Sequence, residues 1–242
     1  MGLDEAGRGS LIGSMVIAGV VIRECDMQKL IEIGVRDSKK LSRSKRERIF
    51  QELLSIARLV IVRVVSPYEI DRSNLNKLEI ETFRNIIETA CISLGECPHK
   101  IYTDAVEPEK KTEEILKRIR GVKEVHVEAE AEEKHLIVAA ASIIAKVLRD
   151  WHLDSIRRTL GDIGSGYPSD IRTLKWLEEN KELARELGGY LIRRKWSTYK
   201  KQIQEITPTL DKYMLHEKIK NNKNKEENTQ PEDRTPKNHL PS

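Results

Sequence analysis

The sequence predicts an α/β protein in which helices flank a mixed β-sheet and a helical part follows at the C-terminal end. Two observations support this fold class. Three apolar segments suited to strands occur early in the chain, and the segments after them alternate between helical and strand patterns. That order is typical of one sheet that combines antiparallel and parallel strands. The 242 residues suffice for one large domain or at most two folded units.

The first elements are predicted from apolar runs and their boundaries. Leu3 precedes a polar, glycine-containing turn, and the β-branched run Met15–Ile22 then indicates a buried strand. Strand, glycine turn and strand predict an antiparallel hairpin. Ser42 is a suitable N-cap for a helix over about Arg43–Ala57, and Leu59–Val65 is predicted to be a third strand.

The later elements follow from the spacing of apolar residues. Helices are expected near Leu75–Cys91, Glu113–Arg120, Val138–Leu160 and Ile171–Leu187, and strands near Lys100–Val106 and Glu124–Ala131. We expect one domain over residues 1–213, with an α/β body at about 1–160 and a helical part at about 161–213. Residues 214–242 are polar and rich in Asn, Lys, Glu and Pro, which predicts a disordered tail.

Composition excludes several classes of protein. The longest apolar run, about Ser14–Ile22, is shorter than the ~20 residues that cross a bilayer, and no secretory signal opens the chain. The three cysteines Cys25, Cys91 and Cys97 are odd in number and lack metal-site spacing. We therefore expect reduced thiols in a cytoplasmic, monomeric protein with no membrane partner, rather than a secreted or disulfide-stapled one.

The net charge of +4 comes from short cationic segments and not from the tail. Lys39–Arg48 contains six Lys or Arg and one Glu, whereas Arg193–Lys201 contains five Lys or Arg and no acid. Either segment alone is adequately explained as the solvated face of a helix. Two of them in one compact body favour a groove that binds a polyanion.

Four acidic residues lie at or near the ends of predicted strands. They are Asp4, Glu5, Asp104 and Glu132. Adjacent strand residues point to opposite faces, so Asp4 and Glu5 can serve one site only if their strand ends or bulges there. Carboxylates that converge at one sheet edge repel one another unless divalent cations neutralise them, and Mg²⁺ or Mn²⁺ prefers such oxygen ligands. Two ions in one site would support phosphodiester hydrolysis.

The acids also have a simpler interpretation. A strand that ends in Asp is common, so Asp104 alone is explained as a turn residue, and Glu132 is one of several acids in Glu128–Glu133. The Gly7, Gly9 and Gly13 spacing differs from that of a dinucleotide-binding turn, and no P-loop motif occurs.

Five motifs, in order, resemble type 2 ribonuclease H, ribonuclease HII, in its archaeal and eukaryotic branch. The opening Leu3-Asp4-Glu5-Ala6-Gly7-Arg8-Gly9 carries the likeness over the first strand, and the similarity extends over about residues 1–200. The others are Asp37-Ser38-Lys39-Lys40-Leu41 with the later acid Asp104, Ala140-Ala141-Ser142-Ile143-Ile144-Ala145-Lys146, Gly164-Ser165-Gly166-Tyr167-Pro168-Ser169-Asp170, and Ile192-Arg193-Arg194-Lys195-Trp196.

The resemblance implies a ribonuclease H-like fold and a metal-dependent endonuclease. Such an enzyme cleaves the RNA strand of RNA–DNA hybrids and cuts duplex DNA at embedded ribonucleotides. It requires Mg²⁺ or Mn²⁺ and leaves 5′-phosphate and 3′-hydroxyl ends. Two alternatives remain open at this stage. One is a non-catalytic nucleic-acid-binding relative, and the other is a nuclease of the same fold that does not select ribose.

The resemblance also implies roles for individual residues. Asp4, Glu5 and Asp104 match catalytic, metal-binding acids of the family. The fourth acid lies ten residues before Ser142, where this chain has Glu132 in place of the usual Asp. Its neighbours Glu130 and Glu133 are alternatives for this position.

Substrate contacts are implied in the same way. Gly7, Arg8 and Gly9 match the turn that reads the ribose 2′-hydroxyl, and Tyr167 matches the tyrosine that packs on the sugar. Lys39 and Lys146 are expected to contact backbone phosphates. Without the resemblance, Tyr167 would be interpreted as a loop anchor. Some relatives carry a sliding-clamp box near the C-terminus, but no aromatic residue follows Tyr213. We therefore expect no clamp binding through the tail.

Overall fold

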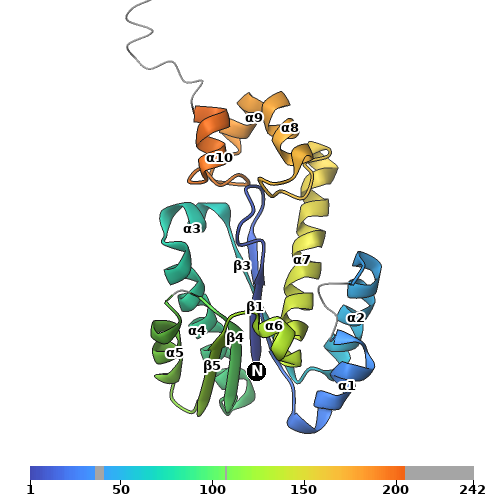
Figure 1. Cartoon of the computed structure of the whole chain (residues 1–242), viewed down its shortest axis with the longest axis vertical. Coiled ribbons are helices and arrows are strands. Elements are labelled where there is room, and N and C mark those ends of the chain that lie inside the picture. Colours follow the sequence, from blue (N-terminus) through green and yellow to red (C-terminus); the bar gives the residue numbers. More distant parts are fainter. Residues whose placement is uncertain (36–40, 107, 205–242) are drawn as a thin grey trace, which may run out of the picture.

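One mixed β-sheet of five strands forms the centre of the protein (Figure 1). The computed structural model describes residues 1–35, 41–106 and 108–204. The strand order is β3-β2-β1-β4-β5; β1, β2 and β3 are antiparallel neighbours, whereas β4 and β5 run parallel to β1. The predicted fold class is therefore confirmed. The strands are β1 (Gly2–Ala6), β2 (Met15–Val21), β3 (Leu59–Val65), β4 (Lys100–Asp104) and β5 (Glu124–Glu128).

Helices cover both faces of the sheet, and the alternation along β2 separates two cores. Val16, Ala18 and Val20 pack towards α1 (Met27–Glu32), α2 (Arg43–Ile56) and α7 (Leu136–Leu160). Met15 and Ile17 pack on the opposite face, towards α4 (Leu75–Leu94) and α5 (Glu109–Lys117). Figure 1 shows α7 running alongside β1, with α4 and α5 beyond the sheet. The site acids on β1 consequently lie between two helical layers.

Strand β1 and α7 approach each other closely. A Cβ added to Gly2 would lie 2.2 Å from the carbonyl oxygen of Ile137, so only glycine fits there. The small residues Ala139, Ala140 and Ala141 of α7 are buried against the sheet. This contact fixes the position of Ser142, the next residue of α7, relative to the first strand.

A third core belongs to the C-terminal helices. They are α8 (Ile171–Glu179), α9 (Lys181–Glu186), α10 (Ser197–Tyr199) and a π-helical turn at Lys200–Gln204. Their apolar residues pack on Leu11, Ile12 and the end of α7. The single helix predicted at Ile171–Leu187 is divided in two, because the backbone of Asn180 leaves the helical conformation.

Short elements that sequence patterns did not predict complete the fold. They are a 3-10 turn at Glu24–Asp26, α3 (Pro67–Arg72) and α6 (Ala131–Lys134), together with α1, α10 and the π-helical turn given above. The strand expected to reach Ala131 ends at Glu128, and α6 follows it. Helix α5 begins four residues earlier than the predicted Glu113. The tail expected at 214–242 lies outside the described residues.

The expectation of three reduced cysteines was wrong. Cys91 and Cys97 form a disulfide, and only Cys25 is a free thiol. The two bonded residues are six positions apart. Between them α4 ends at Gly95, whose left-handed backbone turns the chain back and brings the sulfur atoms together. No helix among the described residues is long and apolar enough to cross a membrane.

Candidate catalytic centre

Asp4 and Glu5 lie inside a regular strand. The pairing of β1 with β2 continues from Gly2 to Ala6, so the bulge or strand end expected at these acids does not occur. The two carboxyl groups point to opposite faces, as strand geometry requires. Asp4 is buried and bonds to Ser142 of α7, whereas Glu5 bonds to Glu79 of α4. The first strand therefore presents one acid to each helical layer.

Asp104 is the last residue of β4, the strand next to β1. Its Oδ1 accepts a hydrogen bond from the Ala105 amide at 2.9 Å and from the Ala131 amide at 3.4 Å. The second bond ties the end of β4 to the start of α6. The strand end predicted to carry an acid is thus confirmed for Asp104.

Glu132 lies on α6 and faces α7. Its Oε2 accepts a hydrogen bond from Ser142 Oγ at 2.7 Å and from Lys146 Nζ at 2.9 Å. Ser142 and Lys146 are one helical turn apart, so they hold the carboxylate from the same side. Lys146, expected to contact phosphate, is bound here to an acid, and about a third of its side chain remains exposed.

Glu79 was missed by the sequence-based predictions. Its side chain is almost fully buried on α4, and its Oε2 accepts a hydrogen bond from Arg8 Nε at 3.0 Å. Arg8 Nη2 donates to Asn76 Oδ1 on the same helix. The available signal was the position of Glu79 on the apolar stripe of α4, one turn before Phe83. An acid at such a position needs a partner, and here the partners come from β1 and its turn.

Like charges and burial dominate the electrostatics of these acids. Burial raises the pKa of Asp4 well above its usual range, and the nearby charges of Glu5 and Glu132 act in the same direction. Burial also raises the pKa of Glu5, and neighbouring Glu79 and Asp104 add to the effect. These carboxyl groups therefore lie close enough to repel one another, as expected for the predicted cluster.

The cluster consists of oxygen donors of the kind that hard divalent cations prefer. In the conformation described for residues 1–35, 41–106 and 108–204, no three Asp, Glu, His or Cys side chains converge as a ready ligand set. Glu132 instead bonds to Lys146, and Glu5 to Glu79. The crowded acids and their raised pKa values nevertheless fit a site whose negative charge is neutralised by added cations.

A pocket of about 250 Å³ opens beside Glu5 at the Gly7–Gly9 turn. Tyr167 forms part of its wall, and the guanidinium of Arg149 stacks on the tyrosine ring, 4.7 Å from the centroid. Gly7 has a φ of 85°, and a Cβ there would meet the Arg149 side chain at 2.4 Å. The turn thus approaches its neighbours as only glycine permits.

The cations of Arg193–Lys201 do not act as one surface patch. Arg193 is fully buried, and its guanidinium donates to the carbonyl oxygens of Gly7 at 2.7 Å and Arg8 at 2.6 Å. It therefore supports the turn from behind. Only the remaining cations of this segment, such as Lys195 and Lys200, are exposed. The prediction that the whole segment flanks a groove was wrong for Arg193.

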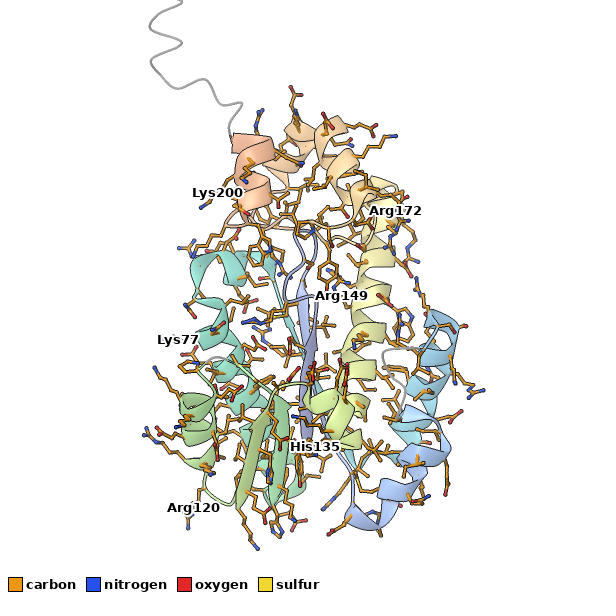
Figure 2. The ribbon with its side chains drawn as sticks, in the orientation of Figure 1. Lys77, Arg120, His135, Arg149, Arg172 and Lys200 are labelled. Carbon is orange, nitrogen blue, oxygen red and sulfur yellow. A yellow bond between two sulfur atoms is a disulfide. The ribbon has the colours of Figure 1, made fainter. Side chains whose placement is uncertain are left out.

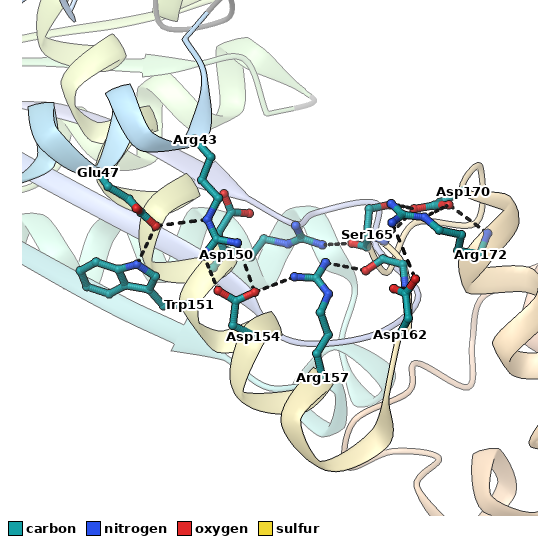
Figure 3. Close-up of polar contacts among 12 residues, drawn as sticks. Arg43, Glu47, Asp150, Trp151, Asp154, Arg157, Asp162, Ser165, Asp170 and Arg172 are labelled. Atoms are coloured by element: carbon teal, nitrogen blue, oxygen red, sulfur yellow. Dashed lines mark hydrogen bonds and ion pairs between the residues drawn. The ribbon is translucent and has the colours of Figure 1, made fainter.

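Acidic partners from α7 neutralise much of the other cationic segment. Arg43 bonds to Asp154, and also to Glu47 of its own helix α2 (Figure 3). Arg46 bonds to Asp150 at 2.9 Å. Sequence counting did not detect Asp150 and Asp154 because they lie more than a hundred residues away from their partners. Arg46 still lines the pocket together with Asp150 and Lys146. Lys39 and Lys40 lie outside the described residues.

The same network continues to the loop that carries Tyr167. Arg157 bonds to Asp154 (Figure 3). It also donates to the carbonyl oxygen of Gly164, and Arg149 donates to that of Ser165. Asp170 caps α8 and accepts the Ser165 amide at 2.7 Å. The loop is therefore held at both ends.

Glu79→Gln is expected to change how stability depends on pH. Burial raises the pKa of Glu79, so the native state keeps a proton that the unfolded chain releases above its ordinary value of about 4.3. Protonated Glu79 therefore contributes fully to the stability of the native state below the ordinary pKa, and this stabilisation is lost as pH rises through the raised pKa. In divalent-free buffer, wild type should lose stability relative to Glu79→Gln between pH 5 and 8, on the order of 1 kcal/mol.

Urea unfolding at several pH values measures this difference, with the exposed Glu114→Gln as the control. The buried amine of Met1, whose pKa burial lowers to about 5, acts in the opposite direction in every variant and cancels. A wild-type minus Glu79→Gln difference that stays constant across the range would refute the raised pKa.

Comparisons with known proteins agree with this geometry. A family model described as Ribonuclease HII matches residues 1–199. Ribonuclease HII of Pyrococcus abyssi is 39% identical over 222 residues, which cover 88% of this chain and 96% of the relative. The crystal structure of ribonuclease H2 from Pyrococcus horikoshii OT3 superimposes with a TM-score of 0.78 at 39% identity, over 86% of this chain and 98% of that one.

A chain in the PCNA:RNase HII complex from Archaeoglobus fulgidus is 35% identical, with a TM-score of 0.71 over 81% of this chain and 94% of its own length. The likeness therefore spans nearly all of each relative. The expected family resemblance is confirmed: this chain belongs to the ribonuclease HII family, metal-dependent endoribonucleases that act on RNA–DNA hybrids.

Proposed function

We propose that this chain also cuts duplex DNA at embedded ribonucleotides, by divalent-metal-dependent hydrolysis that leaves 5′-phosphate and 3′-hydroxyl ends. The pocket at the Gly7–Gly9 turn carries the proposal. It joins Glu5, the glycine turn and Tyr167 in one space of about 250 Å³. That volume suits a single nucleotide sugar better than a long stretch of strand, and the pocket is bordered by Glu5 of the acidic cluster.

Asp4, Glu5, Asp104 and Glu132 are the residues proposed to hold Mg²⁺ or Mn²⁺. When bound, such ions stabilise the negative charge that develops on the phosphate oxygens during hydrolysis. Ser142 orients the Asp4 carboxyl group from α7, and the Ala105 and Ala131 amides orient Asp104. These contacts hold Asp4 and Asp104 in place without any ion, whereas Glu132 and Glu5 would have to release Lys146 and Glu79 to bind one.

Lys146 is proposed to link the acidic centre to the substrate. Its ammonium group bonds to Glu132 at 2.9 Å and also lines the pocket. A partly exposed cation at this point attracts a phosphate group and lowers the repulsion between that phosphate and the carboxylates.

The glycine turn is proposed to select ribose. Arg193 fixes the carbonyl oxygens of Gly7 and Arg8, and the Arg8 side chain is bound to α4. The backbone therefore forms a rigid wall. A 2′-hydroxyl both donates and accepts hydrogen bonds, so a fixed backbone can distinguish ribose from deoxyribose. Tyr167, held by Arg149, supplies an aromatic face for the sugar.

A DNA duplex with one ribonucleotide, incubated with Mg²⁺ or Mn²⁺, is expected to be cut once at the ribonucleotide. Asp4→Asn and Asp104→Asn should each lower the rate by more than about 100-fold, because a metal ligand and its charge are lost. Gel analysis of labelled strands measures both site and rate. Glu114→Gln, which removes an exposed acid from α5, is the control. An uncut duplex with either ion would exclude the proposed function.

Glu132→Gln is expected to lower the cleavage rate by about 10- to 100-fold while duplex affinity stays within about twofold. Glu130→Gln and Glu133→Gln are matched controls, since these neighbours were the alternative fourth acids. Single-turnover rates and fluorescence anisotropy separate chemistry from binding. Full activity of Glu132→Gln would assign the fourth position to another acid. Binding without cleavage by wild type would instead support a non-catalytic relative, which the Glu at position 132 favours.

Tyr167→Ala is expected to reduce kcat/KM at a single ribonucleotide by about 10-fold or more, because the aromatic face that positions the sugar is lost. Tyr167→Phe keeps that face and should retain most activity. Affinity for an all-DNA duplex should change little in either variant. An equal loss of cleavage and of all-DNA affinity would indicate a general structural role, and would favour a nuclease without ribose selection.

A further inference from the structure

A large cavity lies away from the acids, in the groove between α4 and α5. Its volume is about 690 Å³. Isoleucines form its floor, and cationic side chains form much of its rim. Figure 1 shows the two helices side by side at the edge of the protein, and Figure 2 labels Lys77 of the rim. The lining residues with side-chain charge are Lys77, Glu81, Arg84, Lys111 and Arg118.

The rim of this α4–α5 groove has an excess of positive charge. Lys77 lies 3.8 Å from Glu81, and Arg84 bonds at 2.8 Å to Glu88, which is not part of the lining. Lys111 and Arg118 are exposed on α5 and have no acidic partner in the part of the chain that the structure describes. An anion that enters the groove can therefore bind to Lys111 and Arg118 without displacing an acidic partner among the described residues.

One end of the α4–α5 groove adjoins the candidate catalytic centre. Asn76 lines it and also accepts a hydrogen bond from Arg8 of the glycine turn. Pro108, at the same mouth, follows Asp104 by only four residues. Asn74 and Pro108 are the N-caps of α4 and α5, so both helices direct their positive ends there. The positive potential of the groove thus begins directly beside the acidic site.

We propose that the α4–α5 groove binds the phosphodiester backbone of the substrate at nucleotides beyond the cleavage position. This inference rests on the proposed function, since the bound strand is the one held at the acids. Lys77 and Arg84 are seven residues apart on α4, about 10 Å along the helix axis. That span equals the rise of roughly three nucleotides of one strand, so the two cations are spaced to contact phosphates about three nucleotides apart.

The test replaces the two cations that have no acidic partner among the described residues, in Lys111→Gln/Arg118→Gln. Its matched control is Lys110→Gln/Arg120→Gln, which removes two exposed cations from the same region that do not line the groove. Both variants lose the same net charge, so long-range attraction falls equally. Neither touches the acids or the glycine turn. Circular dichroism and thermal unfolding confirm that both variants fold.

Each protein is assayed on duplexes with one ribonucleotide, extended stepwise on its 5′ side or its 3′ side. The groove variant should lose about 3- to 30-fold in kcat/KM on duplexes extended on one side only, with kcat unchanged. On the shortest duplexes it should equal the control. The slope of log(kcat/KM) against log[salt] should become shallower by about one to two, as expected for one or two lost phosphate contacts.

Equal losses in the groove variant and the control, or a loss that does not depend on duplex length, would overturn the proposal. Anisotropy of an uncut duplex in divalent-free buffer tests the groove separately from cleavage. If wild type cuts no ribonucleotide but the groove variant still binds long duplexes more weakly than the control, the proposed function fails and the groove assignment stands. If cleavage occurs and the two variants bind alike, only the groove assignment fails.

Discussion

Arg193 joins segments that are far apart in the sequence, and the geometry of the site depends on that contact. Its guanidinium donates to the carbonyl oxygens of Gly7, Arg8 and Gly13, and it stacks on the ring of Trp196. Burial lowers the pKa of Arg193 to about 9. A buried cation is costly unless it is well bonded. Here the carbonyl dipoles compensate for burial, so the turn and the C-terminal part stabilise each other.

The pocket wall is built from the same contacts. The Leu11 and Ile12 amides donate to the carbonyl oxygen of Gly166, next to Tyr167, and the Arg193 amide donates to that of Leu11. The glycine turn, the tyrosine loop and the C-terminal segment therefore form one hydrogen-bonded unit. The motif around residue 193 thus fixes the backbone of the Gly7–Gly9 turn, the turn proposed to select ribose.

Sequence reasoning predicted the elements with clear periodicity and one acid at a strand end, Asp104. Leu59–Val65 was predicted to the residue, and Asp104 ends its strand as expected. The features that sequence reasoning missed depend on contacts between segments far apart in the chain. Glu79 gains its partners only when α4 packs beside β1, and Arg43 is neutralised by Asp154, 111 residues later. Local charge counts contain no information about such pairs. The basic segment Lys39–Arg48 was therefore expected to be unpaired, whereas Arg43 and Arg46 form ion pairs with Asp154 and Asp150.

Strand alternation explains how the acidic centre is divided. In a regular β1, Asp4 must face α7 and Glu5 must face α4, so a cluster built on this strand needs support from both helical layers. Ser142 and Lys146 give that support on one side, and Glu79 and Arg8 give it on the other. A bulge would have brought both carboxyl groups to one face, but it would have disrupted the pairing with β2. The regular strand keeps the sheet intact and makes α4, which also forms a wall of the α4–α5 groove, part of the candidate catalytic centre.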